Sequence, residues 1–133
     1  MDFSYYDKDQ ADQYSFIRIP RAMMTEEILD PLSMESKMLY GLLLDKMSLS
    51  FKNQWLDDDN RAYVLYPISE IMEDMNISKK KAMASLNELS DMGLVEKKPQ
   101  GFGRPSVLYV KKFKIQSAKV PYRNHERCIF GTQ

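Results

Sequence analysis

Two helical patterns joined by a short turn, and followed at once by two strand-like runs, most narrowly constrain the fold of this chain. Apolar residues recur with helical spacing over 69–75 and again over 78–92. The runs 94–98 and 107–110 then flank a loop rich in glycine and proline, which is the pattern of a β-hairpin. The sequence therefore predicts a helix-turn-helix followed by a hairpin.

The region before these elements contains a longer helical pattern and a short strand. Ser33 is a good N-cap for a helix that runs to about Ser48, and 62–66 has the composition of a strand. Helix, strand, helix, helix, strand, strand is the order of a winged helix. The predicted fold class is therefore α+β, a winged helix-turn-helix with a short β-hairpin wing.

The N-terminal region is less regular. A strand-like run at 16–19 is stopped by Pro20, which suggests an edge strand, and Thr25 is expected to start a short helix that ends by Asp30. We assign 1–14 to a flexible acidic tail, 15–114 to the winged-helix domain, and 115–133 to a linker toward a C-terminal domain that this sequence does not include.

Positive charge is concentrated in the second half of the chain. Residues 1–77 contain seven Lys and Arg against fifteen Asp and Glu, whereas 78–114 contain nine against three. A chain of zero net charge thus has a local surplus of +6 in 78–114, and the last nineteen residues add +2. A basic region of this kind suits a surface that faces phosphate groups.

Three consecutive lysines open the second helix of the helix-turn-helix. Lys79, Lys80 and Lys81 stand where the helix dipole disfavours positive charge, so helix stability does not explain them. In a helix-turn-helix, the start of this helix enters the major groove of DNA. We expect Ala84 and Ser85 on its outward face, where small side chains let the backbone approach base edges. The alternative interpretation is an ordinary solvated helix.

The predicted hairpin is basic as well. Arg104 stands between Gly103 and Pro105, and an arginine on an extended tip suits the narrow minor groove of A·T-rich DNA. A solvated hairpin end is the alternative. The candidate DNA-contacting residues are Lys79, Lys80, Lys81, Ala84, Ser85, Lys97, Lys98, Gln100, Arg104 and Lys111, and Lys112 adds to the charge beside the wing.

Other kinds of site are poorly supported. The run 57–59 is acidic but lacks further metal ligands, and His125 with Cys128 has no second ligand pair. No residues form a plausible catalytic triad or a phosphate-binding glycine loop. We therefore expect no enzyme activity, cofactor or metal. Without a signal sequence or a long apolar run, the chain is expected to be cytoplasmic, with no membrane partner.

Several stretches of the sequence are specific enough to indicate a family: 37–50, 52–55, 71–73, 94–96, 100–105 and 109–111. They include Tyr-Gly-Leu-Leu-Leu-Asp at 40–45. Over about residues 15–113, the sequence resembles the N-terminal domain of the RepA-type replication initiators of plasmids from low-GC Gram-positive bacteria.

This resemblance implies a domain that binds repeated double-stranded sites in a plasmid origin, usually as a homodimer, so that host replication proteins are recruited. The family would assign that recruitment partly to the C-terminal domain missing here. Two other functions fit a winged helix: a transcriptional regulator and a protein-assembly module. The candidate dimer surface consists of apolar residues, with core packing as the alternative: Phe16, Ile17, Ile19, Met23 and Met24.

Overall fold

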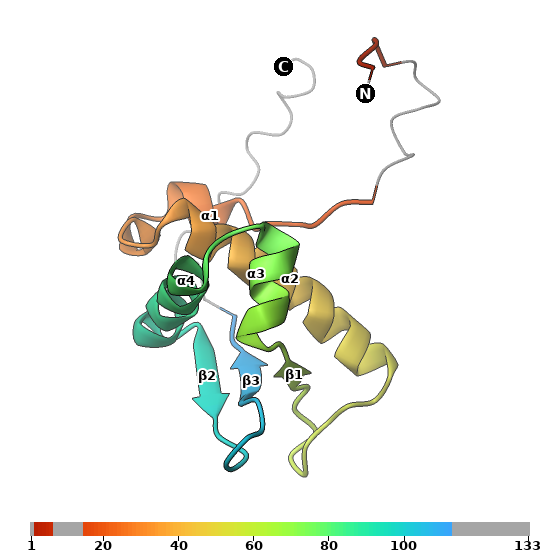
Figure 1. Ribbon diagram of the computed structural model, residues 1–133, viewed down its shortest axis with the longest axis vertical. Coiled ribbons are helices and arrows are strands. Elements are labelled where there is room, and N and C mark those ends of the chain that lie inside the picture. The colour runs from red at the N-terminus through yellow and green to blue at the C-terminus, as the bar shows by residue number, and fades with distance from the viewer. Residues whose placement is uncertain (1, 7–14, 113–133) are drawn as a thin grey trace.

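Helices pack on one side of a small antiparallel sheet in the order that the sequence predicts (Figure 1). The computed structural model describes residues 2–6 and 15–112. Its helices are α1 (Ala22–Thr25), the 3-10 turn η1 (Glu27–Leu29), α2 (Met34–Lys52), α3 (Ile68–Met75) and α4 (Lys79–Met92), and its strands are β1 (Val64–Leu65), β2 (Val95–Lys98) and β3 (Val107–Val110). The α+β winged helix-turn-helix is confirmed.

The sheet has the strand order β1-β3-β2, so β3 is the central strand. Both neighbours run antiparallel to it, with Val64 opposite Leu108 and Val95 opposite Val110. β2, β3 and the loop between them form the wing. At the lower end of Figure 1, the wing loop and the loop that leads from α2 to β1 both extend away from the helices.

The helix-turn-helix forms as predicted because its termini are specified locally. α3 ends at Asn76, which takes the left-handed conformation (φ 54°). The side chain of Ser78 then accepts a hydrogen bond from the backbone N–H of Lys81 at 3.2 Å and caps α4. Gly93, with φ 94°, ends α4.

Helix α2 begins where expected but ends four residues later. Ser33 caps it by accepting a hydrogen bond from the N–H of Ser36 at 3.2 Å. The helix continues past Ser48 to Lys52, because no breaker occurs there and the Ser50 hydroxyl donates to the Tyr63 carbonyl at 2.7 Å. The apolar spacing did not indicate this last turn, since Leu49 and Phe51 are exposed.

The N-terminal predictions were wrong in detail. Residues 16–19 form no strand but an extended segment that crosses α2 at Gly41, where a Cβ atom would lie 2.8 Å from Ile19 Cγ1 and 3.0 Å from the Arg18 carbonyl oxygen. A side chain at position 41 would therefore force the crossing segment or the Ile19 side chain to shift. Thr25 ends a helix instead of starting one, because α1 begins just after Pro20 and Arg21, where proline can precede a helix at no loss of hydrogen bonding.

The core lies between α2, α3, α4 and the inner face of the sheet. Leu39 and Leu43 of α2, Ile71 of α3, Leu89 of α4 and Leu108 of β3 are all at least 99% buried. Tyr40 connects α2 to the segment that follows β3, because its hydroxyl donates to the Lys111 carbonyl at 2.5 Å.

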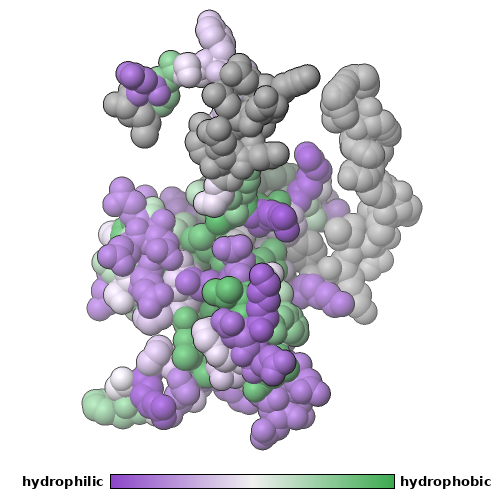
Figure 2. Space-filling model, turned by 90° about the vertical axis from the view of Figure 1, so that its right-hand side faces the viewer, coloured by the Kyte–Doolittle hydropathy of each residue, from purple (hydrophilic) through white to green (hydrophobic). Residues whose placement is uncertain are grey.

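The surface is mainly hydrophilic on the side drawn in Figure 2, with apolar residues exposed between the polar ones. Phe51, Trp55 and Leu65 are each about half exposed. None of the described helices combines the length and the apolar character needed to cross a membrane.

Candidate nucleic-acid interface

The outward face of α4 begins with two exposed lysines. Lys79 and Lys80 occupy the first turn after the Ser78 cap, and within the described residues neither forms an ion pair. Residues three and four apart share a helix face, so Lys80, Ala84 and Asn87 follow one another along the outside of α4. All three are exposed, as predicted for Lys80 and Ala84.

Lys81 is exposed but has a partner. Its ammonium nitrogen lies 3.7 Å from Oε2 of Glu35 in the first turn of α2, and the two side chains are 65% and 38% exposed. An ion pair this open to water contributes about 0–1 kcal/mol. Lys81 can therefore exchange Glu35 for another anion at little loss of stability.

Ser85 was predicted on the outward face, and this is wrong. It is only 2% exposed, and its carbonyl accepts a hydrogen bond from the Ser36 hydroxyl at 3.2 Å. Ser85 lies three residues after Ala82 and four before Leu89, so it belongs to the buried stripe. Its small size lets α4 pack closely against the first turn of α2, and Ser85 cannot reach a ligand beside α4.

Glu88 fixes this packing of α4 on α2. One carboxylate oxygen accepts hydrogen bonds from the backbone N–H of Ser33 at 2.8 Å and from the Ser36 hydroxyl at 2.7 Å. The Ser33 N–H, followed by the Ser36 hydroxyl, lowers the pKa of Glu88. Glu88 therefore acts as an internal cap for α2, and it is not a residue of the outward face.

A groove separates α4 from the wing. It encloses about 540 Å³. Across it, the Lys97 ammonium donates a hydrogen bond to Oδ1 of Asn87 at 2.6 Å, which connects the wing to α4. The residues that line it are Tyr66, Pro67, Ile68, Met83, Leu86, Asn87, Lys97, Gly103, Arg104, Pro105, Ser106 and Leu108.

The wing loop is a closed turn. The backbone N–H of Arg104 donates to the Gly101 carbonyl at 3.2 Å, and Nε2 of Gln100 donates to the Pro105 carbonyl at 3.0 Å. The predicted site residue Gln100 therefore has a role within the loop. Arg104 is exposed at the groove and has no ion pair in the described part of the chain. We call the surface made of Lys79, Lys80, Ala84, Asn87, Lys97 and Arg104 the groove face.

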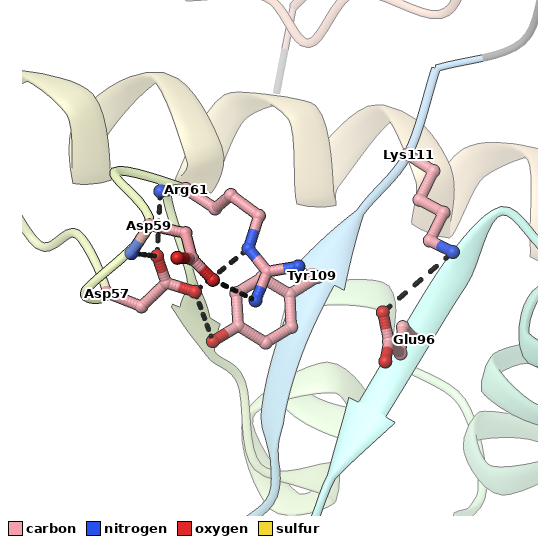
Figure 3. Close-up of polar contacts among 6 residues, drawn as sticks. All are labelled: Asp57, Asp59, Arg61, Glu96, Tyr109 and Lys111. Carbon is pink, nitrogen blue, oxygen red and sulfur yellow. Dashed lines mark hydrogen bonds and ion pairs between the residues drawn. The ribbon is translucent and has the colours of Figure 1, made fainter.

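Lys98 and Lys111 lie on the other face of the hairpin. Side chains alternate between the two faces of a strand, so Lys98 and Glu96 point away from Lys97. The Lys98 ammonium lies 6.0 Å from the centre of the Tyr109 ring, and that of Lys111 lies 3.8 Å from Oε1 of Glu96 (Figure 3). The structure thus divides the predicted basic residues of the wing between two surfaces. We call the second one the Tyr109 face.

The Tyr109 face continues into the acidic loop before β1 (Figure 3). The Asp57 carboxylate accepts hydrogen bonds from the N–H groups of Asp59 and Arg61 at 2.9 and 2.8 Å, and from Arg61 Nε and the Tyr109 hydroxyl, both at 3.0 Å. The Arg61 guanidinium also lies over the Tyr109 ring. Asp57 is therefore committed to holding the loop against β3.

These hydrogen bonds stabilise the charged form of Asp57. The N–H of Arg61, which contributes most, lowers the pKa of Asp57 from 3.8 to about 2. The Asp57 hydrogen bond in turn favours the charged form of Arg61 and raises its pKa. Among the described residues, no group of three or more His, Cys, Asp and Glu is arranged to hold a metal ion. His125 and Cys128 lie outside the described residues.

The structure buries part of the predicted dimer surface and exposes the rest. Met23 is fully buried in the core, and Ile19 packs against it, so these two residues are not free to bind a second copy. Phe16, Ile17 and Met24 are exposed by 67%, 38% and 52%. Only these three keep the candidate role.

Two residues of this region are not among the predicted DNA contacts. Asn87 follows Lys80 by seven residues, which is the spacing of one helix face, so the sequence already places it beside the outward face. Phe102 is fully exposed between Gly101 and Gly103. An apolar residue between two glycines of a loop can be recognised in the sequence as a candidate contact, but a search based on charge does not find it.

The helix-turn-helix, the three-stranded antiparallel sheet and the wing together define a winged-helix domain. The chain belongs to the family described as "Replication initiator protein A (RepA) N-terminus", whose model matches residues 15–123. The resemblance inferred from the sequence is confirmed.

Solved structures and a curated relative agree with this assignment. The chain is similar to a structure described as "N-Terminal domain of DNA binding protein", with 29% identity and a TM-score of 0.71 over 87% of this chain and 88% of that chain. It is also similar to a structure described as "Structure of Rep-DNA complex", with 30% identity and a TM-score of 0.70 over 84% of this chain and 86% of that chain. A "Structure of MDR initiator", at 24% identity and TM-score 0.69 over 86% and 90% of the two chains, shares the fold. A "41 kDa protein" of Lactobacillus helveticus is 29% identical over 97 residues, which are 73% of this chain but only 28% of that protein.

Proposed function

We propose that this domain binds double-stranded DNA with sequence specificity at repeated sites in a plasmid replication origin, and that it acts there without catalysing a reaction. The observation that carries the proposal is the groove face, which carries exposed cations on both α4 and the wing. Among the described residues, Lys79, Lys80 and Arg104 form no ion pair, and Arg104 and Lys97 both line the groove beside α4. Membership of the initiator family and the likeness to a Rep-DNA complex support it.

The elements suggest how the duplex is held. The start of α4 enters the major groove, where Lys79 and Lys80 contact phosphates or guanine edges and Ala84 lets the helix approach the bases. Lys97 and Arg104 then contact the backbone and the neighbouring minor groove. Asn87 holds Lys97 at 2.6 Å, so α4 and the wing bind as one unit.

Pairing of two copies and recruitment of other proteins belong to the same proposal. Repeated sites favour a homodimer, and the exposed Phe16, Ile17 and Met24 are the surface we propose for it. Because the chain spans 28% of the length of its curated relative, contact with host replication proteins is proposed for the remainder of such a longer protein.

A binding titration tests the proposal. We would titrate the full chain, by fluorescence anisotropy, into a duplex that carries direct repeats from a candidate plasmid origin and into a scrambled duplex, at several salt concentrations. About four phosphate contacts predict a log–log salt slope of magnitude about 4. Changing Lys79 and Lys80 to Ala should lower affinity about 30-fold or more and reduce the slope by about 2.

The matched control removes the same charge from the Tyr109 face. The double variant Lys98→Ala with Lys111→Ala should bind within about threefold of the wild type. Equal and weak binding of the wild type to both duplexes would contradict the proposal and favour a protein-assembly module. Preference for a single promoter palindrome over tandem repeats would favour a transcriptional regulator.

A further inference from the structure

The tip of the wing presents a large apolar side chain to solvent. Phe102 has a relative exposure of 106%, the highest of the large apolar residues in the described part of the chain. Its neighbours Gly101 and Gly103 take φ values of 127° and 79°, conformations open mainly to glycine. These glycines make the turn that holds the ring away from the protein.

The turn around Phe102 is fixed from both sides. The hydrogen bond from the Arg104 N–H to Gly101 closes the tip at 3.2 Å, and the one from the Gln100 side chain to Pro105 closes its base at 3.0 Å. The ring is therefore presented by an ordered loop. An apolar side chain held in water gains nothing for folding, and the whole surface of this ring is available to a ligand.

The surroundings of Phe102 indicate the chemistry of that partner. Arg104 is two residues away at the groove, and Lys97 precedes the same loop on the groove face. An apolar ring with cations nearby in the same hairpin matches a ligand with an apolar interior and an anionic outside. In duplex DNA, stacked bases lie behind a line of phosphates.

We propose that Phe102 is a wedge that enters the minor groove beside the site read by α4 and partly unstacks one base step, bending the duplex. This inference rests on the proposed function. Arg104 would hold the phosphate next to the opened step, and flanking glycines without side chains let the backbone approach the groove. Proteins that bind minor grooves use inserted apolar side chains in this way.

The test uses the full chain and a duplex selected by the wild type from a random-sequence pool. 2-Aminopurine, whose fluorescence rises when it is unstacked, is placed in turn at each position beyond the major-groove site, and bending is measured by energy transfer between the duplex ends. We expect a fluorescence rise confined to one step, with bending, for the wild type and for Phe102→Leu. Phe102→Ala should lose both signals and bind about 10-fold more weakly.

The salt dependence separates the wedge from a charge effect. Phe102→Ala should leave the log–log salt slope unchanged, whereas Arg104→Ala should reduce it by about 1. Phe51→Ala, which removes a half-exposed phenylalanine from α2, is the matched control and should bind like the wild type.

Two results would overturn the wedge while leaving DNA binding intact: wild-type binding with no unstacking at any position, or full affinity and bending in Phe102→Ala. Failure of the wild type to select any duplex would overturn the proposed function as well. Anionic phosphatidylserine vesicles provide the last arm. A Phe102-dependent attachment to vesicles, with duplex binding that does not depend on Phe102, would assign the ring to a lipid surface and overturn the wedge.

Discussion

The groove face and the Tyr109 face both contain basic side chains, but the two surfaces use them differently. On the Tyr109 face, Lys111 pairs with Glu96, and Arg61 pairs with Asp57 and Asp59. On the groove face, Lys79, Lys80 and Arg104 have no carboxylate partner among the described residues. On the Tyr109 face, ion pairs hold Arg61 and Lys111 to the fold, whereas we propose that the cations of the groove face bind an external anion. Composition alone cannot make this distinction.

Charge reversal at two consecutive residues of β2 gives the largest expected difference in DNA binding between the two faces. Lys97 faces the groove and Lys98 the opposite side. Lys97→Glu should weaken duplex binding about 30-fold, because it places a like charge against the phosphates. Lys98→Glu should weaken it less than about threefold, measured by the same anisotropy titration. Equal losses would mean that the DNA does not distinguish the two faces.

Asp57→Asn, on the Tyr109 face, should lower thermal stability and leave DNA binding nearly unchanged. The variant loses the charged acceptor of four hydrogen bonds, so we expect its Tm at pH 7 to fall by about 5 °C, with duplex affinity within twofold. A large loss of affinity at unchanged Tm would show that the Tyr109 face contacts the ligand.

The same substitution has a defined pH dependence. The pKa of Asp57 is lowered from 3.8 to about 2, so its stabilising effect is fully present above about pH 4 and is lost as the pH falls through about 2. The Tm difference between wild type and Asp57→Asn should therefore persist from pH 7 to pH 4 and shrink toward pH 2. Thermal melts at these pH values check it, and a constant difference would contradict it.

Glu35→Gln is expected to raise duplex affinity by adding a free cation to the groove face. Glu35 holds Lys81 at 3.7 Å, so removing its charge frees a cation at the edge of the groove face. We expect affinity to rise about threefold at low salt, with a smaller gain at high salt because the effect is screened. Unchanged affinity would indicate that Lys81 stays away from the duplex.

The smallest effect is expected at Ser85. Because it is buried against α2, Ser85→Ala should leave duplex affinity within about 1.5-fold. Its exposed neighbour provides the contrast: Ala84→Glu should reduce affinity about 10-fold through repulsion of phosphate. A specific loss in Ser85→Ala would mean that α4 rotates when it binds.

The elements with strong local signals could be predicted from the sequence. Caps at Ser33 and Ser78, the glycine at 93 and the hairpin loop each specify a boundary through their own backbone chemistry. The extra turn of α2 could not be predicted, because the contact that supports it joins Ser50 to Tyr63, thirteen residues later.

The candidate site was predictable to the level of its segments but not of each side chain. Lys79, Lys80 and Arg104 were found because charge is visible in a sequence. Ser85 shares the buried stripe of α4 with Ala82, Leu86 and Leu89, but a small polar residue at that spacing does not reveal from the sequence whether it packs inside or faces out. The division of the wing lysines depends on strand register, which pairing with β3 determines.

The crossing of α2 by the N-terminal segment limits which side chains position 41 can carry. Glycine in a helix interior is about 1 kcal/mol less favourable than alanine, yet here any Cβ would meet Ile19 Cγ1 at 2.8 Å and the Arg18 carbonyl at 3.0 Å. In a saturation-mutagenesis library, substitutions at position 41 should therefore be depleted relative to those at the exposed positions of α2. Glycine, which is intrinsically unfavourable in a helix, would then be the residue that this position retains.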